Sequence, residues 1–294
     1  MSNINSKIED WWNKNTFSYG VAKNDFNKHD QVGAVDFDRI NLFFFSEIDR
    51  KFAKHFQINF NDFLIQNFQI SELKNKKILD IACGSGIFTV KFAKISKNVE
   101  AIDLTENAVK LTKIHLKLLG LNASVSKMDA QNLRFKDNSF DFVNAWGCLM
   151  HMPDTQKAIN EIYRCSNKNS KTLGYFYNKN SWAYWFSIIF LRGIILLGFF
   201  KYGFNSTRLV SRFTDGQTQG GNILTKVYSK KQLKKMYQEA GFDEIEVENV
   251  FIKGYADRLP ARKFPIFKYL PNKIKDVLSE KFAWGLIVKA TKLK

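Results

Sequence analysis

Short apolar runs alternate with longer amphipathic runs from residue 76 to the end of this chain, and this pattern restricts the fold more than any other. Runs rich in Ile, Val, Leu and Phe predict strands, whereas apolar residues at every third or fourth position predict helices. Strands joined by helices lie parallel in one sheet, so the sequence predicts a doubly wound α/β fold. The predicted strands cover residues 76–82, 98–104, 123–130, 139–147, 171–178, 244–253 and 283–291. The last two form a hairpin-like pair that would add an antiparallel edge.

Capping residues mark the ends of the predicted helices. These helices cover residues 86–95, 105–120, 154–166 and 229–241. Thr105 can cap the second of them and Gly120 can end it. Ser229 and Gln232 have the spacing of a capping box, and Gly241 ends that last helix.

Three segments depart from the alternation. Residues 36–70 have a wide apolar face and predict one or two helices, so we expect residues 1–73 to form a helical N-terminal cap. The α/β domain then spans residues 74–294, with insertions at 180–226 and 254–280. Insertions near the carboxyl edge of such a sheet lie where ligands bind, so we expect a lid over the substrate there.

The first insertion contains a long apolar stretch. Residues 182–200 include a single charge, that of Arg192, and are long enough to span a membrane. A membrane-spanning helix here would place strands of one sheet on opposite sides of the bilayer. Residues 182–200 are therefore not expected to cross a membrane. It is a buried cap helix, a helix in the membrane interface, or a wall of an apolar pocket, and the last two are compatible.

The net charge of +17 is concentrated near the C-terminal end, where residues 253–294 carry 11 basic and 3 acidic side chains. A basic surface attracts nucleic acid, anionic lipid head groups or acidic small molecules. A compositional preference for lysine without any partner explains the charge equally well. Because no RNA-binding motif accompanies it, a nucleic-acid partner is not expected.

The cysteines and the start of the chain indicate a reducing compartment. Cys83, Cys148 and Cys165 lack metal-ligand spacing and cannot all pair, so neither a metal site nor a disulfide scaffold is expected. The first residues contain no basic-then-apolar signal, and the predicted location is therefore the cytoplasm.

A glycine turn follows the first predicted strand, in the run ILDIACGSG. Gly84 and Gly86 let the backbone approach a ligand closely, and the next helix offers free N–H groups at its start. A dinucleotide fingerprint needs Gly or Ala at position 89, but the chain has Thr89, which disfavours NAD or FAD. The sequence also lacks a P-loop.

Acidic residues end three successive predicted strands, at Asp80, Asp103 and Asp129. A carboxylate at Asp103 can accept hydrogen bonds from both hydroxyls of a ribose, and one at Asp129 can accept from an adenine amino group. With a turn that lacks the third glycine, this arrangement predicts an adenosine ligand without a pyrophosphate.

The segments ILDIACGSG, EAIDLTENAV and MDAQNLRFKDNSFDFV, with the helix after His151, resemble class I S-adenosylmethionine-dependent methyltransferases. The nearest group is similar to the ubiquinone/menaquinone-biosynthesis enzymes (methyltransferase type 11). The resemblance covers about residues 74–180 and continues loosely through the last two strands. It implies a Rossmann-like, seven-stranded sheet that is mostly parallel, with an antiparallel last strand and the cofactor at its carboxyl edge.

The resemblance also implies residue roles. Gly84 and Gly86 would lie beside the methionine moiety, Asp80 near its amino group, Asp103 on the ribose and Asp129 by the adenine. The full set expected at S-adenosyl-L-methionine is Asp80, Ala82, Cys83, Gly84, Gly86, Asp103, Leu104, Met128, Asp129, Ala130 and Trp146. Ala82 departs from the family, which often has glycine there, and narrows the turn slightly.

The methyl acceptor is less constrained. His151 lies where it could take a proton from an acceptor hydroxyl, or it is a structural histidine in the loop. Residues 144–147 lack the Asp/Asn-Pro-Pro-aromatic run of enzymes that methylate base amines. The polar stretch 212–222 is a lid over the acceptor or a surface turn. Trp11 and Trp12 close the cofactor pocket or only anchor the N-terminal arm.

The sequence thus predicts methyl transfer to an oxygen or carbon atom of a small or lipid-like acceptor. Peripheral membrane contact through residues 182–200 and the basic C-terminal region would suit an amphiphilic acceptor. Two alternatives are an RNA-modifying methyltransferase and a non-catalytic S-adenosylmethionine-binding accessory subunit. The oligomeric state is not predicted.

Overall fold

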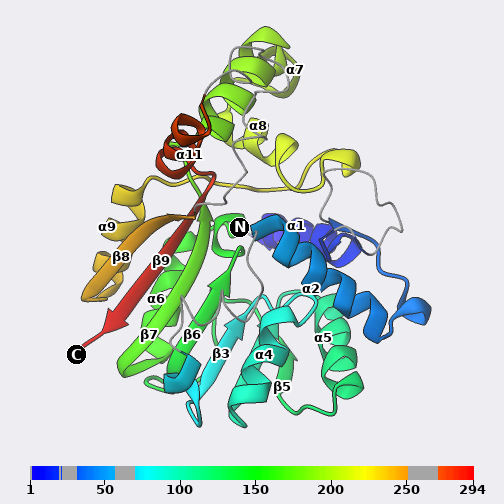
Figure 1. Cartoon of the computed structure of the whole chain (residues 1–294), viewed down its shortest axis with the longest axis vertical. Helices are drawn as coiled ribbons and strands as arrows, with labels where there is room; N and C mark the ends of the chain where they lie inside the picture. Colours follow the sequence, from blue (N-terminus) through cyan, green and yellow to red (C-terminus); the bar gives the residue numbers. More distant parts are fainter. Residues whose placement is uncertain (1, 20, 22–31, 57–69, 251–270) are drawn as a thin grey trace.

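A seven-stranded sheet with the order β5-β4-β3-β6-β7-β9-β8 forms the centre of the molecule (Figure 1). The computed structural model describes residues 2–19, 21, 32–56, 70–250 and 271–294. The strands are β3 (Ile78–Ile81), β4 (Val99–Asp103), β5 (Ser124–Lys127), β6 (Phe140–Trp146), β7 (Ser166–Tyr177), β8 (Glu244–Val250) and β9 (Gly285–Lys292). The predicted α/β sheet is confirmed, and each predicted strand is present.

The antiparallel strand of this sheet is β9, the last in the chain. The pairs β3–β4, β3–β6, β4–β5 and β6–β7 are parallel, whereas β9 runs antiparallel to both β7 and β8. The predicted pair therefore forms, but the edge strand itself is β8 and the antiparallel strand lies one place inward. Burial explains this order, because β9 is mostly buried while β8 alternates exposed and half-buried residues.

Helices cover the two faces of the sheet. They are α4 (Ile87–Ile95), α5 (Glu106–Leu118), α6 (Thr155–Cys165) and α9 (Lys230–Ala240). α6 packs with α9, and α4 packs with α5 on the other side (Figure 1). The predicted caps are confirmed: the Thr105 hydroxyl accepts from Ala108 N–H, and Ser229 and Gln232 form the capping box.

The N-terminal segment packs directly on the helices of the sheet. It contains α1 (Ser2–Lys14), the short strands β1 (Thr16–Phe17) and β2 (Val32–Gly33), and α2 (Leu42–Phe56). Phe45 and Phe52 of α2 belong to the same buried core as the central strands. The helix predicted over residues 36–70 is present in α2, while residues 57–69 lie outside the described residues.

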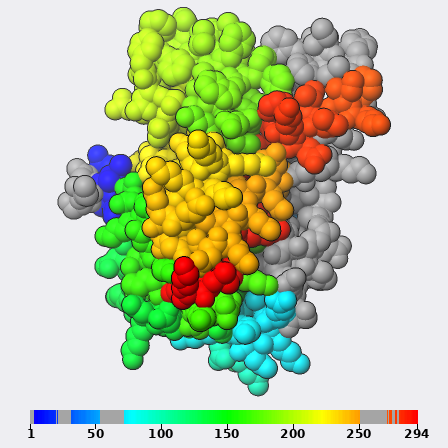
Figure 2. All heavy atoms as spheres, turned by 90° about the vertical axis from the view of Figure 1, so that its left-hand side faces the viewer, coloured from blue at the N-terminus to red at the C-terminus, as the bar shows by residue number. Residues whose placement is uncertain are grey.

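Residues 180–226 form a cap above the carboxyl edge of the sheet, and we use that name for them below. The cap contains η4 (Ala183–Ile195), α7 (Gly198–Tyr202), α8 (Ser206–Phe213) and η5 (Gln217–Gln219). It stands at one end of the molecule with α11 (Asn272–Lys281) beside it (Figures 1 and 2). Of the second predicted insertion, residues 254–270 lie outside the described residues.

The apolar stretch 182–200 is buried on one side only. η4 is wound as a π-helix, and the left-handed backbone of Leu197 (φ 53°) separates it from α7. Tyr184 and Ile188 are buried within the cap, whereas Phe200 is 74% exposed. The interpretation of residues 182–200 as a buried helix is therefore wrong for the side chains that face outward from the cap. Within the described residues, no helix combines the length and apolarity needed to traverse a membrane.

Candidate functional site

The glycine turn connects β3 to α4 through left-handed backbone. Ala82, Gly84 and Gly86 have φ angles of 58°, 55° and 77°. A Cβ atom at Gly86 would lie 3.1 Å from the Thr112 side chain of α5, so close helix packing excludes a larger residue there. Ala82 carries the left-handed strain that glycine would avoid, which costs about 1–2 kcal/mol. Gly86 provides no side-chain cap, and the Asp80 carboxylate reaches the backbone N–H of Thr89 in the first turn of α4.

Asp80 lies beneath this turn and not on its surface. Its carboxylate accepts from the Thr89 hydroxyl at 2.5 Å and from the Asn144 side-chain amide at 2.8 Å. Burial raises its pKa to about 6. Sequence reasoning used Thr89 only to disfavour a dinucleotide and missed its contact with Asp80. Asn144 Oδ1 finds no hydrogen-bond partner among the described residues, which leaves one buried acceptor atom at the end of β6.

Asp103 ties the second strand to the glycine turn. One of its carboxylate oxygens accepts from Gly84 N–H at 3.1 Å, and the other accepts from the backbone N–H and the hydroxyl of Thr105 at 2.9 Å. Burial raises its pKa, and these hydrogen bonds oppose that effect. The structure therefore brings Asp103 and Gly84 together, as the sequence predicts. Leu104 follows Asp103 at the same edge.

The third strand ends beside the second. Met128 N–H donates to the Asp103 carbonyl at 2.9 Å, which places Met128, Asp129 and Ala130 along the same edge. The Asp129 carboxylate accepts from the backbone and side chain of Gln131 at 2.8 and 3.1 Å. Sequence reasoning missed Gln131, because a glutamine in a loop carries no pattern of its own.

Aromatic rings pack between the turn and the central strands. Trp146, at the end of β6, stacks on Tyr175 with ring centroids 4.6 Å apart and lies 5.4 Å from the Phe88 ring. It is half-buried and packs against the core. This position is compatible with both predicted roles of Trp146, contact with a ligand and core packing.

His151 lies at the carboxyl edge of the sheet, immediately below the cap. Its Nδ1 atom is 2.9 Å from the Leu224 carbonyl, and its Nε2 atom is 3.5 Å from the Asp215 carboxylate. The side chains of His151 and Asp215 are both buried. Burial lowers the pKa of His151 while Asp215 and the Leu224 carbonyl raise it. The cap loop predicted as a lid thus contacts the candidate base.

The N-terminal helix completes the enclosure. Trp12 meets the His151 ring edge-on at 5.0 Å, and the Trp11 ring packs so closely on Gly216 that a Cβ atom there would be 2.4 Å away. α1 and the cap loop therefore meet over His151. Both predicted roles of Trp11 and Trp12, closing the pocket and anchoring the arm, agree with these contacts.

A model of the methyltransferase domain family matches residues 78–169, which run from β3 into β7. A ubiquinone/menaquinone biosynthesis C-methyltransferase of Rickettsia bellii is 28% identical over 190 residues, 60% of this chain and 72% of the relative. A ubiquinone biosynthesis O-methyltransferase of Coxiella burnetii is 28% identical over 117 residues, 40% of this chain and half of the relative. The chain contains a methyltransferase domain of the class I, S-adenosylmethionine-dependent type.

Solved structures show the same fold in this methyltransferase. A methyltransferase from Methanosarcina mazei superposes with a TM-score of 0.51 at 20% identity, covering 75% of this chain and 93% of its own. The [4+2]-cyclase SpnF superposes with a TM-score of 0.52 at 17% identity, covering 87% of this chain and 84% of its own. Because these identities are low, they establish the fold alone.

The geometry of the methyltransferase fits its cofactor, S-adenosylmethionine. The turn brings Gly84 next to the Asp103 carboxylate, and α4 begins without a side-chain cap. A carboxylate beside the start of a helix can bind ribose hydroxyls and a carboxylate group at the same edge. The predicted adenosine ligand without a pyrophosphate matches this family.

Three cysteines and a second histidine of the methyltransferase are buried. Burial raises the pKa of Cys83 and Cys148, so both stay protonated, and Cys165 is also a free buried thiol. His115 stacks on Phe45 at 3.7 Å, and burial lowers its pKa to about 4. The described residues contain no cluster of His, Cys, Asp and Glu that could hold a metal ion.

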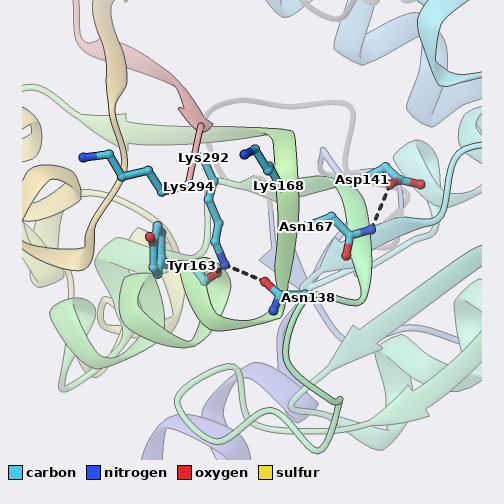
Figure 3. A pocket seen from close by; sticks show the side chains of 7 residues that line it. All are labelled: Asn138, Asp141, Tyr163, Asn167, Lys168, Lys292 and Lys294. Carbon is cyan, nitrogen blue, oxygen red and sulfur yellow. Dashed lines mark hydrogen bonds between the residues drawn. The ribbon is translucent and has the colours of Figure 1, made fainter.

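A polar pocket lies at the opposite end of the sheet, where β6 and β7 begin and β9 ends (Figure 3). Its lining residues are Asn138, Asp141, Tyr163, Asn167, Lys168, Lys292 and Lys294. The Lys292 ammonium donates to Asn138 Oδ1 and to the carbonyls of Tyr163 and Ser166, at 2.8 to 3.1 Å. The ammonium thus donates all three of its protons within the protein, and these hydrogen bonds attach the end of β9 to the neighbouring loop, helix and strand.

Proposed function

We propose that this methyltransferase transfers a methyl group to an oxygen or carbon atom of a small, lipid-like acceptor. The observation that carries the proposal is the position of His151, buried beneath a cap whose outward side is apolar. A buried histidine base suits an acceptor hydroxyl, and the exposed apolar side chains of the cap suit the apolar part of an amphiphile. The relatives, which are C- and O-methyltransferases of quinone biosynthesis, support the same acceptor class.

We infer that the cofactor lies along the carboxyl ends of β3, β4 and β5. Gly84 and Gly86 would contact its methionine moiety, Asp103 its ribose and Asp129 its adenine. Asp80 acts through Thr89 and Asn144 in this proposal, because it is 2% exposed, against 9% for Asp103, and contacts these two residues. The remaining proposed contacts are Ala82, Cys83, Leu104, Met128, Ala130 and Trp146.

When bound, the cofactor supplies an electrophilic methyl group on a sulfonium. The protein's task is to hold donor and acceptor in line and to exclude water. Because the Leu224 carbonyl can only accept, His151 keeps its proton on Nδ1 and presents Nε2 as the base. Nε2 takes the proton of an acceptor hydroxyl, and the resulting oxyanion, or its conjugated carbon, attacks the methyl group. The buried side-chain nitrogen of Asn222 finds no hydrogen-bond partner among the described residues. It would donate a hydrogen bond to an oxygen atom of the methyl acceptor.

Methyl-labelled S-adenosylmethionine tests this proposal. The protein is incubated with lipid, small-molecule and RNA fractions of a cell extract, and labelled products are identified by mass spectrometry. The proposal expects label in the lipid or small-molecule fraction. Label in RNA alone would replace it with RNA modification, and no transfer to any fraction despite cofactor binding would favour an accessory role.

We also propose that the outward side of the cap contacts a membrane surface from which such an acceptor is taken. The exposed apolar residues are Trp185, Phe190, Ile194, Ile195, Leu196, Leu197, Phe200 and Phe204. Residues 181–214 carry four basic side chains and no acidic one. Exposed apolar side chains in a segment of net positive charge favour an anionic lipid surface. The basic C-terminal region adds to this attraction.

A further inference from the structure

Three buried polar side chains from separate parts of the chain meet under the cap. His151 follows β6, Tyr177 ends β7, and Asp215 lies in the cap loop after α8. The Tyr177 hydroxyl donates to both carboxylate oxygens of Asp215, at 3.1 and 3.0 Å. One of these two oxygens, Oδ2, also lies 3.5 Å from His151 Nε2. The cap therefore brings a negative charge to the candidate base.

The hydrogen bonds of His151 determine how its ring is oriented and therefore which nitrogen faces the Asp215 carboxylate. Nδ1 is directed at the Leu224 carbonyl, which can only accept, so Nδ1 carries a proton. The Thr225 hydroxyl gives its own proton to Asn222 Oδ1 at 2.8 Å, so it also presents a lone pair to Nδ1 at 3.2 Å. In the neutral ring, Nε2 then has a lone pair beside a carboxylate. In the imidazolium, Nε2–H points toward that carboxylate.

The surroundings hold Asp215 in this position. Trp284 stacks on the Tyr177 ring at 4.5 Å, which restrains the hydroxyl that binds the carboxylate. The Trp12 ring, from α1, packs on His151 without a charge. The ammonium of Lys226, the residue after Thr225, donates to the Pro153 carbonyl at 2.7 Å. Asp215 is thus the charged group that faces Nε2 among the contacts of the described residues.

We propose that Asp215, oriented by Tyr177, is the positioning residue that stabilises the imidazolium formed on His151 during methyl transfer. His151 Nε2 takes the proton of an acceptor phenol or enol, and the acceptor's oxygen or conjugated carbon forms a bond to the methyl carbon. The carbon–sulfur bond breaks, and sulfur keeps its electron pair. The proton remains on His151, paired with Asp215, until it passes to water. The inference rests on the proposed function, because it assigns a role within the same site.

Nuclear magnetic resonance can measure this pairing without an acceptor. The chain has four histidines, so ¹⁵N-histidine-labelled protein saturated with S-adenosylhomocysteine gives few signals, and His151→Gln identifies that of His151. We expect the pKa of His151 to fall by at least one unit in Asp215→Asn, since the carboxylate no longer favours the charged ring. Asp215→Glu restores the charge and should recover part of this shift. Glu246→Gln removes an exposed carboxylate on β8 and should leave the pKa unchanged.

Activity on the labelled fraction gives the second readout. Methyl transfer requires neutral His151, so kcat/KM rises with pH through the pKa of this residue. In Asp215→Asn we expect this rise to move to lower pH while the plateau falls at least tenfold. Binding of S-adenosylhomocysteine within twofold of wild type shows that the variant is folded.

The outcomes separate the two proposals. If Asp215→Asn leaves both the pKa of His151 and the pH profile unchanged, the pairing is wrong even where methyl transfer is observed. If the pKa shifts but no fraction accepts a methyl group, the pairing holds and the proposed acceptor class fails. If Asp215→Asn loses S-adenosylhomocysteine binding, Tyr177→Phe replaces it, since it removes the hydroxyl that binds the Asp215 carboxylate: a changed His151 pKa supports the pairing, and an unchanged pKa overturns it.

Discussion

Asp103 shows how one carboxylate can organise a binding edge. It accepts from Gly84 of the turn and from Thr105 at the start of α5, so it joins two loops while it faces the proposed ribose position. Its place at the end of a strand, in register with Asp80 and Asp129, could be predicted from the sequence alone. The contacts of Asp80 could not, because they depend on Thr89 and Asn144, which no local pattern links to it.

Replacing Asp103 should weaken cofactor binding. In Asp103→Ala, the lost charge-assisted hydrogen bonds are each worth about 1.5–3 kcal/mol, so the dissociation constant for S-adenosylmethionine should rise at least tenfold. Equilibrium dialysis with labelled cofactor measures it. The exposed Asp38 supplies a control, and Asp38→Ala should bind as wild type. Unchanged binding by Asp103→Ala would remove Asp103 from the site.

His115 should make stability depend on pH. Burial lowers its pKa to about 4 in the folded state, against an ordinary value of about 6.5. Above pH 6.5 neither state is protonated and its contribution is fully present. As pH falls from 6.5 toward 4, only the unfolded state binds the proton, so stability is lost.

His115→Phe removes this proton uptake and keeps a ring against Phe45. Between pH 7 and 5, the free energy of unfolding of the wild type should fall more than that of the variant, by about 1–2 kcal/mol. Asp80, whose raised pKa acts in the opposite direction, is present in both proteins and cancels. Urea unfolding at the two pH values measures the difference, and equal pH dependence in the two proteins would disprove the role of His115.

The elements of the sheet follow from local signals, whereas their order does not. Each apolar run became a strand, and Thr105, Ser229 and Gly241 mark helix ends as predicted. The inward place of β9 results from burial on both faces, which only the assembled sheet determines. Sequence reasoning placed α1 in a helical N-terminal cap without giving its bounds, and it missed the β1–β2 pair, because a strand of two residues carries no periodicity.

The turn between β3 and α4 should be sensitive to any side chain at Gly86. Gly86→Ala combines a positive φ with a contact at 3.1 Å to Thr112. Gly120→Ala is the matched control, since Gly120 also has positive φ (64°) but no atom within 4 Å of an added Cβ. We expect a loss of about 1 kcal/mol in unfolding free energy for Gly120→Ala and about 2–3 kcal/mol for Gly86→Ala. Equal losses in chemical denaturation would contradict the close packing of α5.

In the whole molecule, the cap lies over the carboxyl edge of the sheet, where the cofactor is proposed to bind. Asp215 and His151 are 64 positions apart in the sequence, and they meet only because the cap folds back over the sheet. No strand–helix alternation extends through residues 180–226, so the sequence predicted a lid but not its contacts. The outward side of the cap, with Phe200 and Phe204, lies at the end of the molecule beside α11 (Figure 2).

Vesicle flotation tests the proposed membrane contact of this surface. The protein should float with vesicles of phosphatidylcholine and phosphatidylglycerol, and much less with phosphatidylcholine alone. Combining Phe200→Ser with Phe204→Ser should reduce bound protein at least fivefold, because two exposed rings are lost. Phe43→Ser replaces an aromatic residue on α2 that is 70% exposed, and binding should persist. Equal loss in both variants would show that the cap is not the contacting surface.

Titration calorimetry with S-adenosylhomocysteine and, separately, with NAD⁺ tests most directly which ligand the carboxyl edge of the sheet holds. The turn at Gly84 and the carboxylate of Asp103 predict saturable one-to-one binding of S-adenosylhomocysteine and none of NAD⁺ at the same concentrations. Saturable binding of NAD⁺ without any heat from S-adenosylhomocysteine would contradict the account.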